Sequence, residues 1–100
     1  MITLEDIYLS NRKGKRYVAL FNNNNKLIKV HFGLKNPKIG TYIDHHNKKI
    51  RENYILRHSV LEKEYLNNPL TPASLSMYIL WGPYTDINKN IIYFKNKFNL

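Results

Sequence analysis

The stretch RENYILRH, residues 51–58, gathers two arginines, a histidine and a tyrosine within about two turns of a predicted helix. Placed on that helix, Arg51, Arg57 and His58 border the apolar face to which Tyr54 belongs. A guanidinium offers a planar fork of donors that matches a phosphate, and a tyrosine can stack on a ligand or donate a hydrogen bond to it. The spacing is therefore typical of an anion-binding site.

The same side chains have an ordinary structural use. Arginine and histidine often lay their apolar stems along the edge of a core and keep their polar heads at its border. Here they would pair with Asp44, Glu52 or Glu62, which lie close by in the sequence. The sequence leaves both interpretations of the helix open.

A second group of cations surrounds a glycine turn near the N-terminus, in NRKGKR, residues 11–16. Its members are Arg12, Lys13, Lys15 and Arg16. Lys29 and His31 follow on the polar face of a predicted strand, and Arg16 is expected on the corresponding face of its neighbour. A basic loop beside a basic sheet face, with tyrosines nearby, can follow a phosphate backbone and stack bases. The alternative is a solvated sheet face whose lysines prevent edge-to-edge pairing.

Other chemistries find less support in the residues. His45 and His46, with Asp44 and His58, do not have the spacing of a metal site, and the chain has no cysteine. Ser59, Ser74 and Ser76 lack the sequence context of a catalytic nucleophile. The helical glutamates have the pattern of solvated charges rather than of a catalytic carboxylate pair; they are Glu52, Glu62 and Glu64. We therefore expect no metal, no cofactor and, on balance, no catalysis.

Alternating residues predict a β-hairpin over residues 15–33. Tyr17, Ala19 and Phe21 alternate with polar or outward positions in the first arm, and Ile28, Val30 and Phe32 do so in the second. Asn22 to Asn25 form the predicted loop tip, because asparagine tolerates left-handed backbone geometry. DIYLS, residues 6–10, predicts a third strand, joined through the turn at residues 11–14. The result is an antiparallel meander of three strands.

Helical patterns fill the rest of the chain after a loop broken by Pro37 and Gly40. Asp44 is the predicted N-cap of a helix reaching residue 66, with Ile50, Tyr54, Leu61 and Tyr65 on one face. Thr71 and Pro72 begin a second helix, apolar nearly all round and ended by Gly82. Thr85 is the predicted cap of a third, whose apolar stripe is Ile87, Ile91, Phe94 and Phe98. The expected fold is a single α+β domain, residues 1–100, with a small antiparallel three-stranded sheet packed against three C-terminal helices.

The composition points to a polyanionic partner. Lys and Arg total 16 against 7 Asp and Glu in 100 residues, which gives a net charge of +9. Basic surfaces of this kind favour nucleic acid first and an anionic membrane surface second. An AT-rich genome would also enrich Lys and Asn. The start of the sequence lacks the pattern of a signal peptide, and no segment has the apolar length of a membrane span, so we expect a soluble, intracellular protein.

Four stretches together resemble a family of small basic proteins of uncharacterised function from nucleocytoplasmic large DNA viruses. They are RKGKRYVALF, KVHFG, RENYILRH and LTPASLSMYILWG. The matching positions are Lys13 to Arg16, His31 to Gly33, Arg51 to His58 and Thr71 to Gly82, whereas the segment between Gly33 and Asp44 departs from the pattern. The resemblance implies a viral origin, with a location in the host cytoplasm, the viral factory or the virion.

The sequence is compatible with three functions. The first is a nucleic-acid-binding protein without catalytic activity, which contacts the phosphate backbone, of DNA in preference to RNA. Its nine predicted contacts are Arg12, Lys13, Lys15, Arg16, Lys29, His31, Arg51, Arg57 and His58. The second is a structural component of a virion, whose segment from Trp81 to Leu100 packs on another viral protein. The third is a small phosphate-handling hydrolase that uses His31, His58 and Arg51 as acid, base and phosphate clamp.

Overall fold

A computed structural model describes residues 1–35 and 38–100 and shows the predicted α+β fold. The sheet has three antiparallel strands in the order β1 (Ile2–Leu9), β2 (Lys15–Asn23) and β3 (Lys26–Leu34). The helical elements follow: α1 (Tyr42–His45), α2 (Lys48–Leu61), α3 (Pro72–Leu75), the π-helical turn η1 (Ser76–Leu80) and α4 (Ile87–Phe98). The predicted loop break at Pro37 lies outside the described residues.

The β2–β3 hairpin is the best-predicted element. Its tip is tighter than the expected run of four asparagines, because β2 continues through Asn23 and only Asn24 and Asn25 have left-handed backbone, with φ of 51° and 72°. Asparagine adopts this conformation more readily than other non-glycine residues. The turn pairs Asn23 with Lys26, and this pairing sets the register of the whole hairpin.

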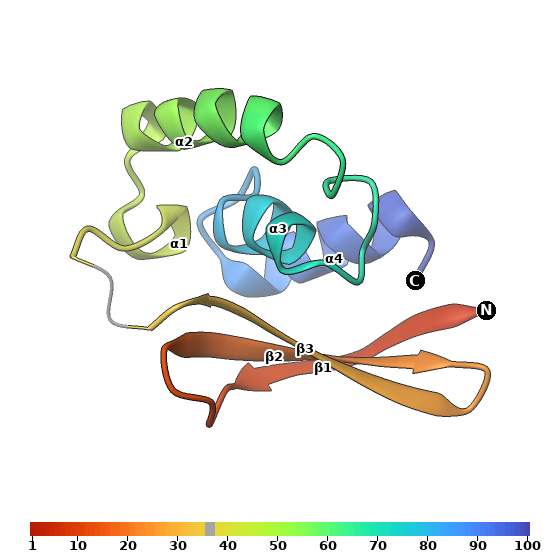
Figure 1. Ribbon diagram of the computed structural model, residues 1–100. Helices are drawn as coiled ribbons and strands as arrows, with labels where there is room; N and C mark the ends of the chain where they lie inside the picture. The colour runs from red at the N-terminus through yellow and green to blue at the C-terminus, as the bar shows by residue number, and fades with distance from the viewer. Residues whose placement is uncertain (36–37) are drawn as a thin grey trace.

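The strand alternation is confirmed on both arms. Tyr17, Ala19 and Phe21 contact or form the core, and so do their cross-strand partners Phe32, Val30 and Ile28. All the helices lie on this side of the sheet, as Figure 1 shows. Because side chains alternate along a strand, the intervening residues point to the opposite face, which no helix covers.

The central helix is also confirmed. Thr71 accepts a hydrogen bond from the Ser74 N–H, and Pro72 occupies the first turn. The chain then widens into η1, where the Trp81 N–H donates to the Ser76 carbonyl. Leu75, Ile79 and Leu80 of this segment are fully buried, so it forms the middle of the core.

Two helix N-caps differ from the prediction. Asp44 does not cap the long helix: it lies in the short helix α1, which follows Thr41, and Asn47 caps α2 instead. The chain breaks between the two helices at His46, whose φ of 57° is left-handed. Likewise Asp86, rather than Thr85, is the cap of α4. In each case several polar residues near the boundary could serve as the N-cap, and tertiary packing determines which of them does so.

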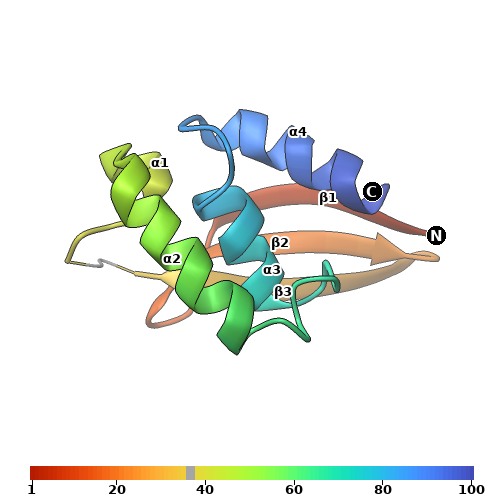
Figure 2. The ribbon, with the colours of Figure 1, turned by 90° about the horizontal axis from the view of Figure 1, so that it is seen from above.

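The α2 helix is shorter and more exposed than predicted. It ends at Leu61, and although Ile50 and Tyr54 pack against the core, Leu61 and Tyr65 point into solvent. Figure 2 shows why: α2 crosses over α3 and its C-terminal end passes beyond the other helices, whereas α4 runs along β1. The predicted stripe of α4, from Ile87 to Phe98, does contact the core.

Candidate nucleic-acid interface

His31 is the centre of a basic cluster on the open face of the sheet. Its Nδ1 lies 2.7 Å from the Ser10 hydroxyl, and the backbone N–H of Arg12 donates to the same hydroxyl at 3.0 Å. Ser10 directly follows β1 and is nearly buried, so these contacts fix the β1–β2 turn against β3. The predicted turn at residues 11–14 is thereby anchored beside the predicted strand cations.

Desolvation and the neighbouring cations both disfavour the charged form of His31. Desolvation, followed by the nearby charges of Arg12, Lys29 and Lys15, lowers the pKa of His31 below its ordinary value. Like charges disfavour a further proton on the ring. We call these four residues the His31 patch. Lys29 and His31 belong to the open face, whereas Lys15 has the strand parity of Tyr17 and lines a hollow with Tyr54 and Glu62 on the helical side. Lys13 stands exposed at the tip of the adjoining turn.

The open face supplies apolar and aromatic surface next to the patch. Val18 pairs with Tyr8 on one side and with His31 on the other, so these three side chains form a row across the sheet. The next row is Asp6, Leu20 and Lys29. Tyr8 is 38% exposed and can stack on a flat ligand, and Asp6 is the acidic member of these rows.

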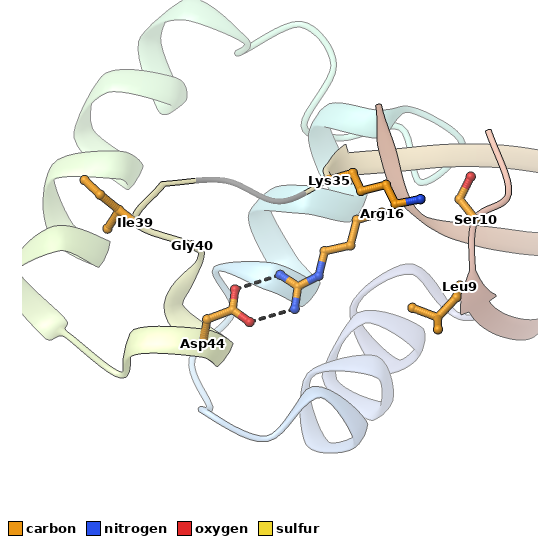
Figure 3. A pocket seen from close by; sticks show the side chains of 7 residues that line it. All are labelled: Leu9, Ser10, Arg16, Lys35, Ile39, Gly40 and Asp44. Carbon is orange, nitrogen blue, oxygen red and sulfur yellow. Dashed lines mark hydrogen bonds and ion pairs between the residues drawn. The ribbon is translucent and has the colours of Figure 1, made fainter. Parts of the chain in front are cut away.

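Arg16 does not join the open face, in contrast to the prediction. Its two terminal nitrogens bind the two carboxylate oxygens of Asp44 at 2.7 and 2.6 Å, as Figure 3 shows. Asp44 also accepts from the N–H and the hydroxyl of Thr41, at 2.8 Å each. The guanidinium and these bonds hold the pKa of Asp44 well below its usual range. A bidentate pair of this kind outweighs the alternation of the strand and turns Arg16 toward α1.

A hollow of about 470 Å³ opens beside this ion pair. Leu9 and Ile39 provide exposed apolar walls, and Ser10 and Lys35 contribute polar groups, as seen in Figure 3. Because Asp44 is neutralised by Arg16, Lys35 is left as the uncompensated charge of the lining. The hollow shares Ser10 with the contacts of the His31 patch and so extends that surface.

The arginine and histidine of the helix motif hold α2 in place. The Arg51 Nε donates to the carbonyls of Trp81 and Gly82 at 3.1 and 2.9 Å, and its guanidinium carbon lies 5.4 Å from the centre of the Tyr42 ring. His58 stacks on Tyr54 and its Nδ1 lies 3.2 Å from a Glu62 oxygen. Arg51 and His58 therefore have the structural role that the sequence left open, and Glu62 is the expected neighbour of His58.

The loop that carries these two carbonyls requires a glycine at position 82. A Cβ atom at Gly82 would lie 2.3 Å from the Tyr78 carbonyl and 2.7 Å from the buried Asn90 side chain. The Asn90 amide in turn donates to the carbonyls of Ile79 and Tyr84, each at 2.8 Å. The loop after η1 is therefore fixed from both sides, and its carbonyls face Arg51.

The nine predicted contacts thus fall into separate groups. Arg12, Lys15, Lys29 and His31 form the patch with Lys13 beside it, and Arg16 points to α1. Arg51, Arg57 and His58 belong to α2, on the helical side of the sheet (Figure 1). Arg57 is exposed there. The acid, base and clamp of the hydrolase hypothesis, His31, His58 and Arg51, are not brought together.

Ser10 and Lys35 are the members of this surface that the sequence did not single out. A serine directly before an Asn-Arg-Lys-Gly turn is a known turn-forming residue, and that signal could have identified Ser10. Lys35 has no local signal, because its place beside Arg16 depends on the strand register.

Within residues 1–35 and 38–100, no group of three or more His, Cys, Asp or Glu side chains could hold a metal ion. In the same part of the chain, no helix is long and apolar enough to cross a membrane.

Comparison with known proteins gives a family and no activity. No curated protein and no solved structure matches the chain. A family model matches residues 5–58. This range contains β1 from Glu5 onward, all of β2, β3 and α1, and most of α2, with every predicted contact residue. The match covers more than half of the chain, which therefore belongs to the Family of unknown function (DUF5754).

Proposed function

We propose that the protein binds nucleic acid without catalysing a reaction and contacts the phosphate backbone through the His31 patch. The partner we propose is DNA in preference to RNA, in the viral setting that the sequence resemblance implies. Arg51 and His58 are left out of the proposed contacts because their polar groups already serve the packing of α2.

The observation that supports this function best is the uncompensated charge around His31. Among the described residues, Arg16 forms an ion pair with Asp44 and the His58 ring lies against Glu62, and neither contact includes a member of the patch. Cations that lack internal partners attract phosphates and release the counterions condensed on nucleic acid. The patch therefore gains free energy from a polyanion that the folded chain itself does not provide.

The geometry suggests how a strand would lie. Lys29 and His31 project from the same face of β3, two residues apart, and Arg12 extends the line of charge into the turn. Phosphates would follow these cations, while Tyr8 offers an aromatic ring at the far side of the Val18 row. Such contacts position a backbone and carry little sequence information.

The test is binding of fluorescently labelled DNA, single-stranded and double-stranded, followed by anisotropy at about 50 mM salt. A variant with Arg12→Gln, Lys15→Gln and Lys29→Gln should bind at least roughly tenfold more weakly, because it loses three phosphate contacts. The matched control carries Lys48→Gln, Lys49→Gln and Lys89→Gln, three exposed lysines on the helices. Both variants lose the same charge, so an equal loss of affinity, or no binding by the unaltered protein, would refute the proposal.

A further inference from the structure

The C-terminal half of α2 and the turn after it present apolar side chains to solvent. Leu56, Val60 and Leu61 are 71%, 78% and 71% exposed, and Tyr65 is 53% exposed. We call these four residues the α2 patch. Contiguous apolar surface of this kind on a small soluble protein marks an interaction site more often than chance exposure does.

The patch is additional to the face that α2 uses in its own fold. Ile50 and Tyr54 already attach the helix to the core, and Leu56 and Val60 stand one turn apart on another side. A helix that needs only one contact carries polar residues elsewhere. A helix with apolar side chains on two sides can pack against its own domain with one side and against a partner protein with the other.

The patch combines a projecting side chain and a hollow. Val60, Leu61 and Tyr65, with Lys63 and Glu64, line a hollow of about 390 Å³. Leu56 stands one helical turn before Val60 and is not part of the lining. If two copies meet with their α2 helices antiparallel, Leu56 of each copy reaches the hollow of the other. A two-fold interface requires this kind of self-complementary surface.

Charge favours the same arrangement. A two-fold axis near Val60 and Leu61 would bring Arg57 of one copy close to the turn after α2 in the other copy, where Glu64 and Tyr65 lie. Arg57 and Glu64 are both exposed, and neither takes part in an ion pair among the described residues. A second copy would therefore supply each of these charges with its counterpart, twice per interface.

We propose that the α2 patch is a homodimer interface, in which two copies pack antiparallel through Leu56, Val60, Leu61 and Tyr65. Lys29 and His31 alternate with the core-facing residues of β3 and so lie on the face of the sheet away from the helices, and the dimer leaves them open. This inference is independent of nucleic-acid binding and stands or falls separately.

Sedimentation equilibrium from about 5 to about 500 μM tests the dimer, since this range spans affinities typical of small interfaces. The unaltered protein should dimerise within it, and Val60→Asp should weaken the dimer by at least roughly tenfold. The control is Leu27→Asp, an exposed leucine on β3 that should leave the dimer unchanged. Because both side chains are exposed, both variants should keep the unaltered circular dichroism spectrum. A monomer throughout, or equal effects of both variants, would overturn the proposal.

Charge reversal tests the register. Arg57→Glu and Glu64→Arg should each weaken the dimer, and the double variant should restore it, because the pair is re-formed with its signs exchanged. Lys63 lies beside Glu64 in the hollow, so a dimer strengthened by Arg57→Glu would contradict this register. The chain has no cysteine, and Val60→Cys should therefore form a disulfide-linked dimer on oxidation, whereas Leu27→Cys should not.

Discussion

The Tyr54 ring lies flat against the indole of Trp81, with centroids 4.1 Å apart and planes inclined by 5°. His58 stacks on the other face of Tyr54 at 4.0 Å. The three rings connect α2 to the end of the central helix, at the point where Arg51 binds the Trp81 and Gly82 carbonyls. The motif whose spacing is typical of an anion-binding site attaches α2 to the rest of the fold.

Removing the Tyr54 ring should destabilise the protein. Tyr54→Ala should lower the free energy of unfolding by about 2–4 kcal/mol, since it deletes a largely buried ring and its stacking on Trp81. Tyr54→Phe keeps the ring and should lie within about 1 kcal/mol of the unaltered protein. Urea denaturation measures both, and equal losses would show that the hydroxyl rather than the stack matters.

The same residue predicts a loss of stability in alkali. Burial, and then the charge of Glu62, raises the pKa of the Tyr54 hydroxyl above its ordinary 10.0. The unfolded chain therefore releases this proton at a lower pH than the folded chain, and the free energy of unfolding falls as pH rises above about 10. Tyr54→Phe should flatten this part of the stability profile. An unchanged alkaline slope in that variant would contradict the burial of the hydroxyl.

Arg51 should matter for stability and not for binding. Arg51→Lys loses the Nε donor shared by two carbonyls and should cost about 1–3 kcal/mol, because a lysine cannot reproduce the planar guanidinium. Its affinity for DNA, measured well below the unfolding temperature, should equal that of the unaltered protein. A loss of affinity without a loss of stability would return Arg51 to the binding surface.

The Arg16–Asp44 pair predicts an acid-sensitive contribution to stability. Asp44→Asn should cost about 1–2 kcal/mol at pH 7, a value limited by the partial exposure of both side chains. Because the pKa of Asp44 in the folded protein lies below its ordinary 3.8, the contribution is complete above that pH and disappears as pH falls below it. The unaltered protein and Asp44→Asn should therefore converge in stability in strong acid. A difference that persists there would assign the effect to packing.

His31 predicts a pH dependence of binding. Its lowered pKa leaves the free imidazole neutral at pH 7, and a phosphate bound nearby favours the protonated ring. Affinity for DNA should therefore rise as pH falls below about 6.5, the ordinary value for histidine. His31→Gln should bind with a pH profile that is flat in this range. A rise of the same size in His31→Gln would exclude the imidazole as its source.

The sequence predicted those parts of the fold that local chemistry determines. Strand alternation identified Tyr17, Phe21 and Phe32 as core residues, and Thr71 with Pro72 marked the central helix. The prediction of the helix boundary at Asp44 was wrong because this residue can either cap a helix or bind a distant arginine. As a cap it would serve one helix, whereas beside Thr41 it also receives Arg16 from a distant strand.

The surface was harder to predict because it depends on contacts between residues far apart in the sequence. Periodicity placed Lys29 and His31 on one face, but nothing local indicated that the turn holding Arg12 folds back onto His31 through Ser10. Nor did the helix pattern reveal that Leu61 and Tyr65 pass beyond the core, because an exposed apolar residue and a buried one have the same period.

The most direct test of the proposed function is the salt dependence of DNA affinity. The logarithm of the association constant should fall linearly with the logarithm of salt concentration, and the Arg12→Gln, Lys15→Gln, Lys29→Gln variant should have a slope smaller by about 2–3 than the unaltered protein. The Lys48→Gln, Lys49→Gln, Lys89→Gln control should keep the original slope. Identical slopes for all three proteins would show that the His31 patch does not contact phosphates.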